Sequence, residues 1–101
     1  MKLIIITVID ALKKDVIKLL EKAEIENYSE SDIDGFKTKI AGKVTTGWFG
    51  GSNYSADSEM FFSFDQKEKV LKLMQFIKEY NKGIEHDNPI RAVIVSVEDY
   101  A

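Results

Sequence analysis

The chain has 101 residues, of which 45% are hydrophobic and 31% charged, with a formal net charge of −3 and no cysteine. This composition predicts one globular domain over residues 1–101, and it excludes disulfide frameworks, thiolate metal sites and cysteine nucleophiles. Because the chain has no basic block, we expect no nucleic-acid partner. Residues 3–9 are too short to cross a bilayer and lack a cleavage site, so we expect a cytoplasmic protein without membrane insertion.

The first third of the chain gives a strand, a helix and a second strand. Residues 3–9 are apolar at nearly every position, which is typical of a strand covered on both faces. A helix follows, because apolar residues recur there at helical spacing: Leu12, Val16, Leu19, Leu20 and Ala23. Asp10 is the candidate N-cap of this helix. Residues 28–40 alternate loosely around Ile33 and Phe36, which predicts a second, more exposed strand.

A long glycine-rich connection joins the second and third strands. Residues 42–54 hold four of the six glycines and the only tryptophan. A hairpin needs only about two to five residues to turn, and a longer connection without apolar periodicity is usually functional. We therefore predict that Trp48, Phe49 and Tyr54 dock a partner protein, since buried aromatic side chains dominate interface energetics. The alternative is an insertion whose aromatic side chains fold back on the sheet.

The second half of the chain repeats the alternation of strand and helix. Residues 60–64 are apolar on both faces and predict a third strand. Asp65 and Glu68 have the spacing of a capping box. The helix that they open carries one apolar face, made of Val70, Leu73, Met74 and Ile77, and Gly83 is placed to end it. After a polar turn, residues 90–97 predict the last strand.

The order of these elements is the ferredoxin-like βαββαβ pattern. It predicts an α+β sandwich, in which a four-stranded antiparallel sheet carries two helices on one face and a long loop joins strands 2 and 3. The first, third and fourth strands carry large apolar side chains on both faces, whereas two helices cover only one face. Because an open apolar face of that size is uncommon on monomers, we expect a homo-oligomer held through the sheet face.

In element order and in two motifs, the chain resembles the PII signal-transduction (nitrogen regulatory P-II-like) family. Asp34-Gly35-Phe36 resembles the family's Gly-Phe at the end of the second strand. Residues 49–54, Phe-Gly-Gly-Ser-Asn-Tyr, are similar to its Tyr-(Lys/Arg)-Gly-(Ala/Ser)-(Ala/Glu)-Tyr signature, which also carries the tyrosine that some members modify. The resemblance implies a homotrimer with inward-facing sheets and three projecting T-loops that contact a target protein.

The resemblance also implies a ligand cleft between subunits. Its candidate cofactor-binding residues are Gly35, Phe36, Lys39, Lys82 and Arg91; Lys39 falls near the family's ligand-responsive glutamine, and Lys82 and Arg91 supply positive charge. The family's ATP signature, Thr-Gly followed by Gly-Asp-Gly-Lys, is absent, because residues 81–91 read Asn-Lys-Gly-Ile-Glu-His-Asp-Asn-Pro-Ile-Arg. Since backbone donors and a cation hold polyphosphates, the cofactor stays open between an adenine nucleotide and a divalent metal.

Glu85, His86 and Asp87 group the only histidine with two carboxylates. Imidazole and carboxylate ligands suit zinc, nickel or cobalt, particularly where three subunits combine their copies, and the alternative is a solvated polar turn. These three residues are the candidate metal ligands.

The chain is similar to short PII-like proteins encoded beside heavy-metal efflux pumps of the RND type. This similarity implies a trimeric regulator that senses a small ligand or metal and acts through the loop on a target protein. The expected target is a membrane transporter or efflux pump. The alternative is a divalent-metal-binding tolerance protein of the same fold. We expect no enzyme and no catalytic residues, because the sequence offers no anion-binding loop after the first strand and no serine-histidine-aspartate arrangement.

Overall fold

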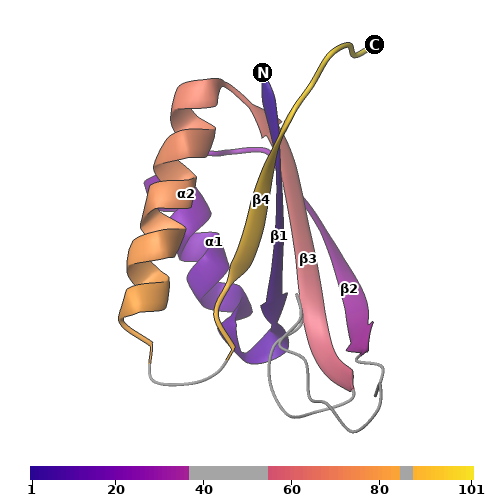
Figure 1. Cartoon of the computed structure of the whole chain (residues 1–101), viewed down its shortest axis with the longest axis vertical. Helices are drawn as coiled ribbons and strands as arrows, with labels where there is room; N and C mark the ends of the chain where they lie inside the picture. The colour runs from indigo at the N-terminus through magenta and orange to yellow at the C-terminus, as the bar shows by residue number, and fades with distance from the viewer. Residues whose placement is uncertain (37–54, 85–87) are drawn as a thin grey trace, which may run out of the picture.

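The computed structural model describes residues 1–36, 55–84 and 88–101, which form one four-stranded antiparallel sheet and two α-helices (Figure 1). The strands are β1 (Lys2–Ile9), β2 (Ser29–Phe36), β3 (Ser55–Asp65) and β4 (Arg91–Ser96). The helices are α1 (Lys13–Lys22) and α2 (Lys67–Lys82), and a 3-10 turn, η1 (Asp10–Leu12), joins β1 to α1. The strand order is β2-β3-β1-β4. This arrangement confirms the predicted ferredoxin-like βαββαβ fold.

Both helices lie on one face of the sheet and enclose the core (Figure 1). Because successive side chains of a strand point to opposite faces, Ile4, Ile6 and Val8 of β1 all point toward the helices and are buried. They pack with the apolar stripes of both helices and with β3; the buried partners are Val16, Leu20, Phe61, Val70, Leu73 and Ile77. Each such side chain stabilises the fold by about 1.5–3 kcal/mol.

The other face of the sheet carries no helix among the described residues, and we call it the open face. It holds two cross-strand rows, made of Phe64, Leu3 and Val95 and of Phe62, Ile5 and Val93. Phe64, Val95 and Val93 are 51%, 44% and 37% exposed. The predicted second apolar face is therefore present.

Two predicted helix caps are wrong. Asp10 does not cap α1, because η1 intervenes, α1 begins at Lys13, and no side-chain hydrogen bond caps either start. At α2 the N-cap is Gln66, with no side-chain cap bond, so the capping box does not form. The Asp65 carboxylate instead accepts a hydrogen bond of 2.7 Å from the Gln66 backbone N–H. Gly83 does end α2, and its N–H donates to the Tyr80 carbonyl at 3.0 Å.

The third strand is longer than its apolar run. It begins at Ser55 instead of residue 60, because β2 pairs with it over its first eight positions, from Phe36 opposite Ser55 to Ser29 opposite Phe62. Backbone pairing thus extends the strand through polar residues that hydrophobic periodicity does not detect. Within the described ranges, no helix is long and apolar enough to span a bilayer.

Candidate functional site

The predicted cofactor-binding residues that the structure describes lie near one end of the sheet. Because β1 runs antiparallel to β3 and β4, and β2 antiparallel to β3, the last residues of β1 and β2 and the first residues of β3 and β4 lie at one end. We call it the loop end. The helix α2 also finishes there, whereas both chain termini lie at the opposite end (Figure 1).

Four of the predicted cofactor-binding residues lie in the described part of the chain. Gly35 and Phe36 are the last two residues of β2. Lys82 is the exposed last residue of α2, and Arg91 is the half-buried first residue of β4. All four therefore belong to elements that finish or start at the loop end. The fifth, Lys39, lies outside the described residues.

Arg91 carries an unusual polar atom. Its Nε is buried and has no hydrogen-bond partner in the part of the chain that the structure describes. Arg91 lies opposite Thr7 of β1 and, by strand alternation, on the open-face side of β4. A buried guanidinium N–H without a partner is costly, so this side chain is suited to an anionic group.

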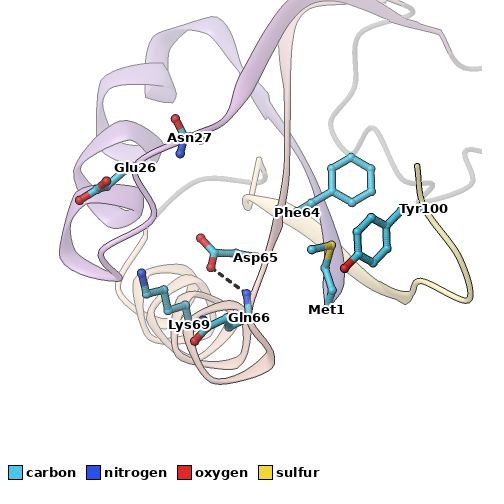
Figure 2. Close-up of a pocket in the computed structure, with 8 residues that line it drawn as sticks. All are labelled: Met1, Glu26, Asn27, Phe64, Asp65, Gln66, Lys69 and Tyr100. Atoms are coloured by element: carbon cyan, nitrogen blue, oxygen red, sulfur yellow. Dashed lines mark hydrogen bonds between the residues drawn. The ribbon is translucent and has the colours of Figure 1, made fainter.

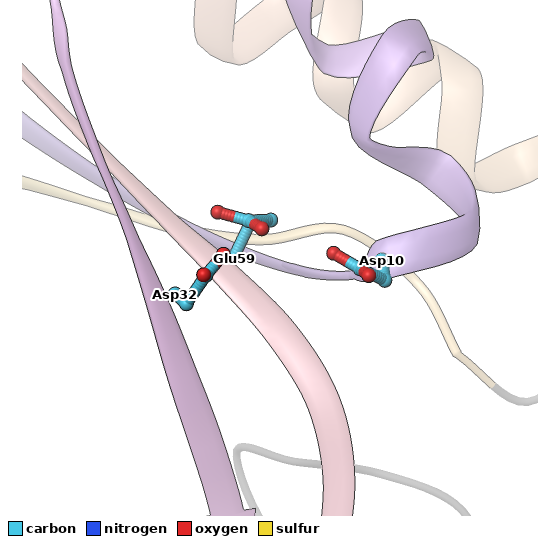
Figure 3. A group of neighbouring side chains, drawn as sticks. All are labelled: Asp10, Asp32 and Glu59. Atoms are coloured by element: carbon cyan, nitrogen blue, oxygen red, sulfur yellow. The ribbon is translucent and has the colours of Figure 1, made fainter.

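A second polar group, absent from the sequence-based predictions, lies on the helix-covered side of the sheet. It consists of Asp10, at the start of η1, Asp32 of β2 and Glu59 of β3, and we call it the acidic cluster (Figure 3). Asp32 and Glu59 are direct cross-strand partners. One carboxylate oxygen of each residue lies within 4.8 Å of the other two. Glu59 is only 3% exposed, whereas both aspartates are exposed.

Lys13, the first residue of α1, is the basic neighbour of the acidic cluster. Its Nζ lies 2.5 Å from Glu30 Oε1 and 3.9 Å from Glu59 Oε1. The hydrogen bond with Glu30 raises the pKa of Lys13. A hydrogen bond with Asp32, followed by burial, raises the pKa of Glu59 to about 7. The proximity of the two carboxyl groups thus opposes ionisation of Glu59.

The sequence carries a signal for the acidic cluster in the alternating acidic residues of β2. Glu30, Asp32 and Asp34 alternate along β2, so they share one face, and the register places Asp57 and Glu59 of β3 beside them. Alternating acids on a strand that borders an apolar one mark a polar patch at the edge of a covered face. The contribution of Asp10 depends on the turn after β1 and has no such signal.

Similarity to solved structures identifies the fold. No family model matches the sequence, and neither does any curated protein. A PII-like signalling protein from Thermus thermophilus is 15% identical, with a TM-score of 0.64 over 93% of this chain and 83% of that one. CPII, a nitrogen regulatory PII-like protein from Thiomonas intermedia solved with ADP, AMP and bicarbonate, is 17% identical, with a TM-score of 0.63 over 99% of this chain and 94% of that one. A DUF3240 family protein from Shewanella baltica is 16% identical, with a TM-score of 0.66 over 99% of this chain and 92% of that one.

The chain has the PII-like fold. The resemblance inferred from element order and short motifs is therefore confirmed for the fold. On the PII-like fold the predicted docking residues Trp48, Phe49 and Tyr54 belong to the connection between β2 and β3, and they lie outside the described residues. The candidate metal ligands Glu85, His86 and Asp87 also lie outside them, so both sets stay predictions.

A shallow hollow of about 500 Å³ lies at the end opposite the loop end (Figure 2). Lys69, Asp65 and Gln66 line one side, and Met1, Phe64 and Tyr100 line the other. None of the predicted site residues lines it. Phe64 belongs both to this hollow and to an apolar row of the open face, so the hollow adjoins the open face and is separate from the loop end.

Proposed function

We propose that this protein is a trimeric PII-like regulator that binds a small anionic ligand, with an adenine nucleotide as the first candidate, at the loop end of its sheet. The observation that carries the proposal is the PII-like fold, which extends over almost the whole chain and is shared with a CPII structure bound to ADP, AMP and bicarbonate. The proposed role is regulatory and cytoplasmic, with no catalytic step.

The loop end supplies the charge that such a ligand needs. Arg91 is the chain's one arginine, and its buried Nε has no partner among the described residues. A guanidinium binds phosphate or bicarbonate oxygens through parallel hydrogen bonds. Lys82, at the end of α2, supplies a second cation from the same end of the molecule. Because the Gly-Asp-Gly-Lys signature is absent, these side chains replace part of the backbone cradle in the proposed site.

The open face supports assembly into a trimer. Its two apolar rows lie on the face that no helix of the described chain covers. Packing three such faces together buries the rows and brings the loop ends of neighbouring subunits close to one another. The ligand then binds between subunits, and the connection of residues 42–54 carries the signal to a target protein.

The proposed target is a membrane transporter or efflux pump, which the loop contacts through Trp48, Phe49 and Tyr54. Ligand binding between subunits would favour one loop conformation over others and so change the affinity for the target. Replacing all three aromatic residues by alanine should abolish target binding while the trimer persists. Target binding that survives the triple replacement would contradict this part of the proposal.

Native mass spectrometry with ADP, AMP, ATP and bicarbonate added singly tests the ligand. We expect a trimer that binds up to three nucleotides. Arg91→Gln should weaken nucleotide binding by about tenfold or more, because a charge-assisted hydrogen bond contributes about 1.5–3 kcal/mol. The matched control Lys72→Gln removes an equal charge from the exposed side of α2 and should leave binding unchanged. A monomer, or a trimer without nucleotide, contradicts the proposal.

Metal sensing by Glu85, His86 and Asp87 is the alternative, and the same instrument tests it. If zinc, nickel or cobalt binds to the trimer and His86→Ala abolishes binding, the protein is a metal-binding tolerance protein in place of a nucleotide sensor. If His86→Ala changes nothing, the alternative is excluded.

A further inference from the structure

Glu59 carries a buried carboxyl oxygen that has no role in the proposed function. Its Oε2 is buried and has no hydrogen-bond partner in the described part of the chain, and its Oε1 lies 3.9 Å from Lys13. A buried carboxylate oxygen without a partner is strongly disfavoured in a folded protein. A proton shared with a neighbouring carboxyl group or a bound cation would satisfy it.

Two further carboxyl groups lie beside Glu59. Asp10 and Asp32 each bring a carboxylate oxygen within 4.8 Å of that of Glu59, and a carboxylate has no proton to donate when it is ionised. Figure 3 shows Glu59 between the two aspartates. Three carboxyl groups from three separate elements thus converge on one point, and the buried one has an oxygen without a hydrogen-bond partner among the described residues.

Lys13 offsets the negative charge of the acidic cluster only in part. Its Nζ lies closer to Glu30 Oε1, at 2.5 Å, than to Glu59 Oε1, at 3.9 Å. One lysine is thus shared between Glu30 and the acidic cluster, so the three carboxylates of the cluster, when ionised, keep an excess of negative charge. A compact positive charge between them would offset it.

We propose that Asp10, Asp32 and Glu59 bind a hard divalent cation of the calcium, manganese or magnesium class. Calcium binds oxygen ligands at about 2.3–2.6 Å, so two ligands on opposite sides of one ion lie up to about 5 Å apart. The spacing of at most 4.8 Å between the three oxygens fits such an ion without backbone movement. The ligands are carboxylates alone, without sulfur or imidazole, and such oxygen ligands suit hard cations.

The site is separate from the loop-end ligand and from residues 85–87. All three ligands come from one subunit and lie on the helix-covered side of the sheet, so binding requires no trimer. Asp32 precedes the end of β2 by four residues, and Glu59 follows the start of β3 by four. A bound cation would therefore fix η1, β2 and β3 to one another close to the end of β2 and the start of β3.

Titration of Mn²⁺ into the EDTA-treated full chain, followed by electron paramagnetic resonance, tests the site. We expect one Mn²⁺ per chain, displaced by Ca²⁺. Glu59→Gln and, separately, Asp32→Asn should each weaken binding by about tenfold or more, since affinity at oxygen sites follows the number of charged ligands. Lys13→Gln should tighten binding about threefold, because it removes a competing positive charge. The control Glu21→Gln removes an exposed carboxylate of α1 and should leave affinity unchanged.

Circular dichroism of every variant separates loss of the site from loss of the fold. The two cluster substitutions are read independently, so misfolding of one leaves the other as the test. Absence of Mn²⁺ binding by the folded chain at millimolar metal overturns the proposal and leaves a shared proton as the occupant. Metal binding that both cluster variants retain, or that only His86→Ala abolishes, also overturns it, because the ion then lies elsewhere.

Discussion

At the residue scale, Glu59 links the stability of the fold to pH. The pKa of Glu59 is raised to about 7 from 4.5, by a hydrogen bond with Asp32 and then by burial. Because the folded chain holds this proton more tightly than the unfolded chain, the stabilisation from Glu59 is complete below about pH 4.5 and is lost as the pH rises through 7. Glu59→Gln, which cannot ionise, should therefore gain thermal stability relative to the parent as the pH rises from 5 to 8.

Thermal melts in EDTA at pH 5 and pH 8 measure this effect without metal. The parent should lose more melting temperature over that interval than Glu59→Gln does. Glu68→Gln, on the exposed first turn of α2, controls for removal of one carboxylate and should track the parent. An equal offset between Glu59→Gln and the parent at both pH values would contradict the raised pKa of Glu59.

Tyr80 of α2 forms a side-chain hydrogen bond with a residue of α1. Its hydroxyl donates a hydrogen bond of 2.6 Å to Asp15 Oδ2, which joins α2 to α1, and burial raises the pKa of Tyr80 to about 12. Tyr80→Phe should destabilise the protein by about 1.5–3 kcal/mol, the usual contribution of a hydrogen bond to a charged acceptor. Urea unfolding at fixed protomer concentration measures it. Tyr100→Phe, at a residue 70% exposed, should change the free energy of unfolding little, and an equal cost in both would refute the contact.

At the element scale, Asn81 fastens the last turn of α2 to the start of β4. Its Nδ2 donates to the Ile90 carbonyl at 2.8 Å, and its Oδ1 accepts from the Ile90 N–H at 2.9 Å. Asn81→Ala removes both bonds and should cost about 2 kcal/mol, or about 1 kcal/mol for each neutral hydrogen bond. Hydrogen exchange of the Ile90 amide should accelerate in the variant. Gln75→Ala removes only an exposed contact of 3.4 Å with Glu79 and is the matched control.

The elements also show which features the sequence could predict. Both helices and the strands β1 and β4 were predicted within a few residues, because each has an apolar pattern that burial enforces locally. The first half of β3 was missed, because Asp57, Ser58 and Glu59 are polar and are held in the strand by pairing with β2. The caps at Asp10 and Asp65 failed because a preferred residue type does not fix where a helix begins.

The candidate site residues likewise include some that the sequence could predict and some that it could not. Arg91 is predicted from its charge and its place before the last strand; its Nε is buried without a partner among the described residues, and its role as a ligand residue stays a prediction. The acidic cluster was not predicted, since Asp10, Asp32 and Glu59 are far apart in sequence and meet only through the register of β2 with β3 and the turn after β1. Local patterns carry information on periodicity, whereas a site assembled from three elements depends on topology.

At the scale of the whole molecule, the open face should hold the subunits together. Phe64 is 51% exposed in the single chain, beside Leu3 on β1, and it packs edge-on against Phe62 at 6.4 Å between ring centroids. Burial of such a side chain stabilises by about 1.5–3 kcal/mol, and a trimer would contain three copies. Phe64→Asp replaces this gain with a buried unpaired charge, so we expect monomers at micromolar concentration.

Light scattering coupled to size-exclusion chromatography measures the mass of each variant. The matched control is Leu71→Asp, because Leu71 is 48% exposed, is also a large apolar residue, and lies on the solvent side of α2. Leu71→Asp should keep the mass of the parent. If both variants keep it, the open face is not the interface; if both lose it, the effect is one of charge or folding. Only dissociation confined to Phe64→Asp identifies the sheet face as the surface that joins the subunits, because exposure and chemistry are matched and only the face differs.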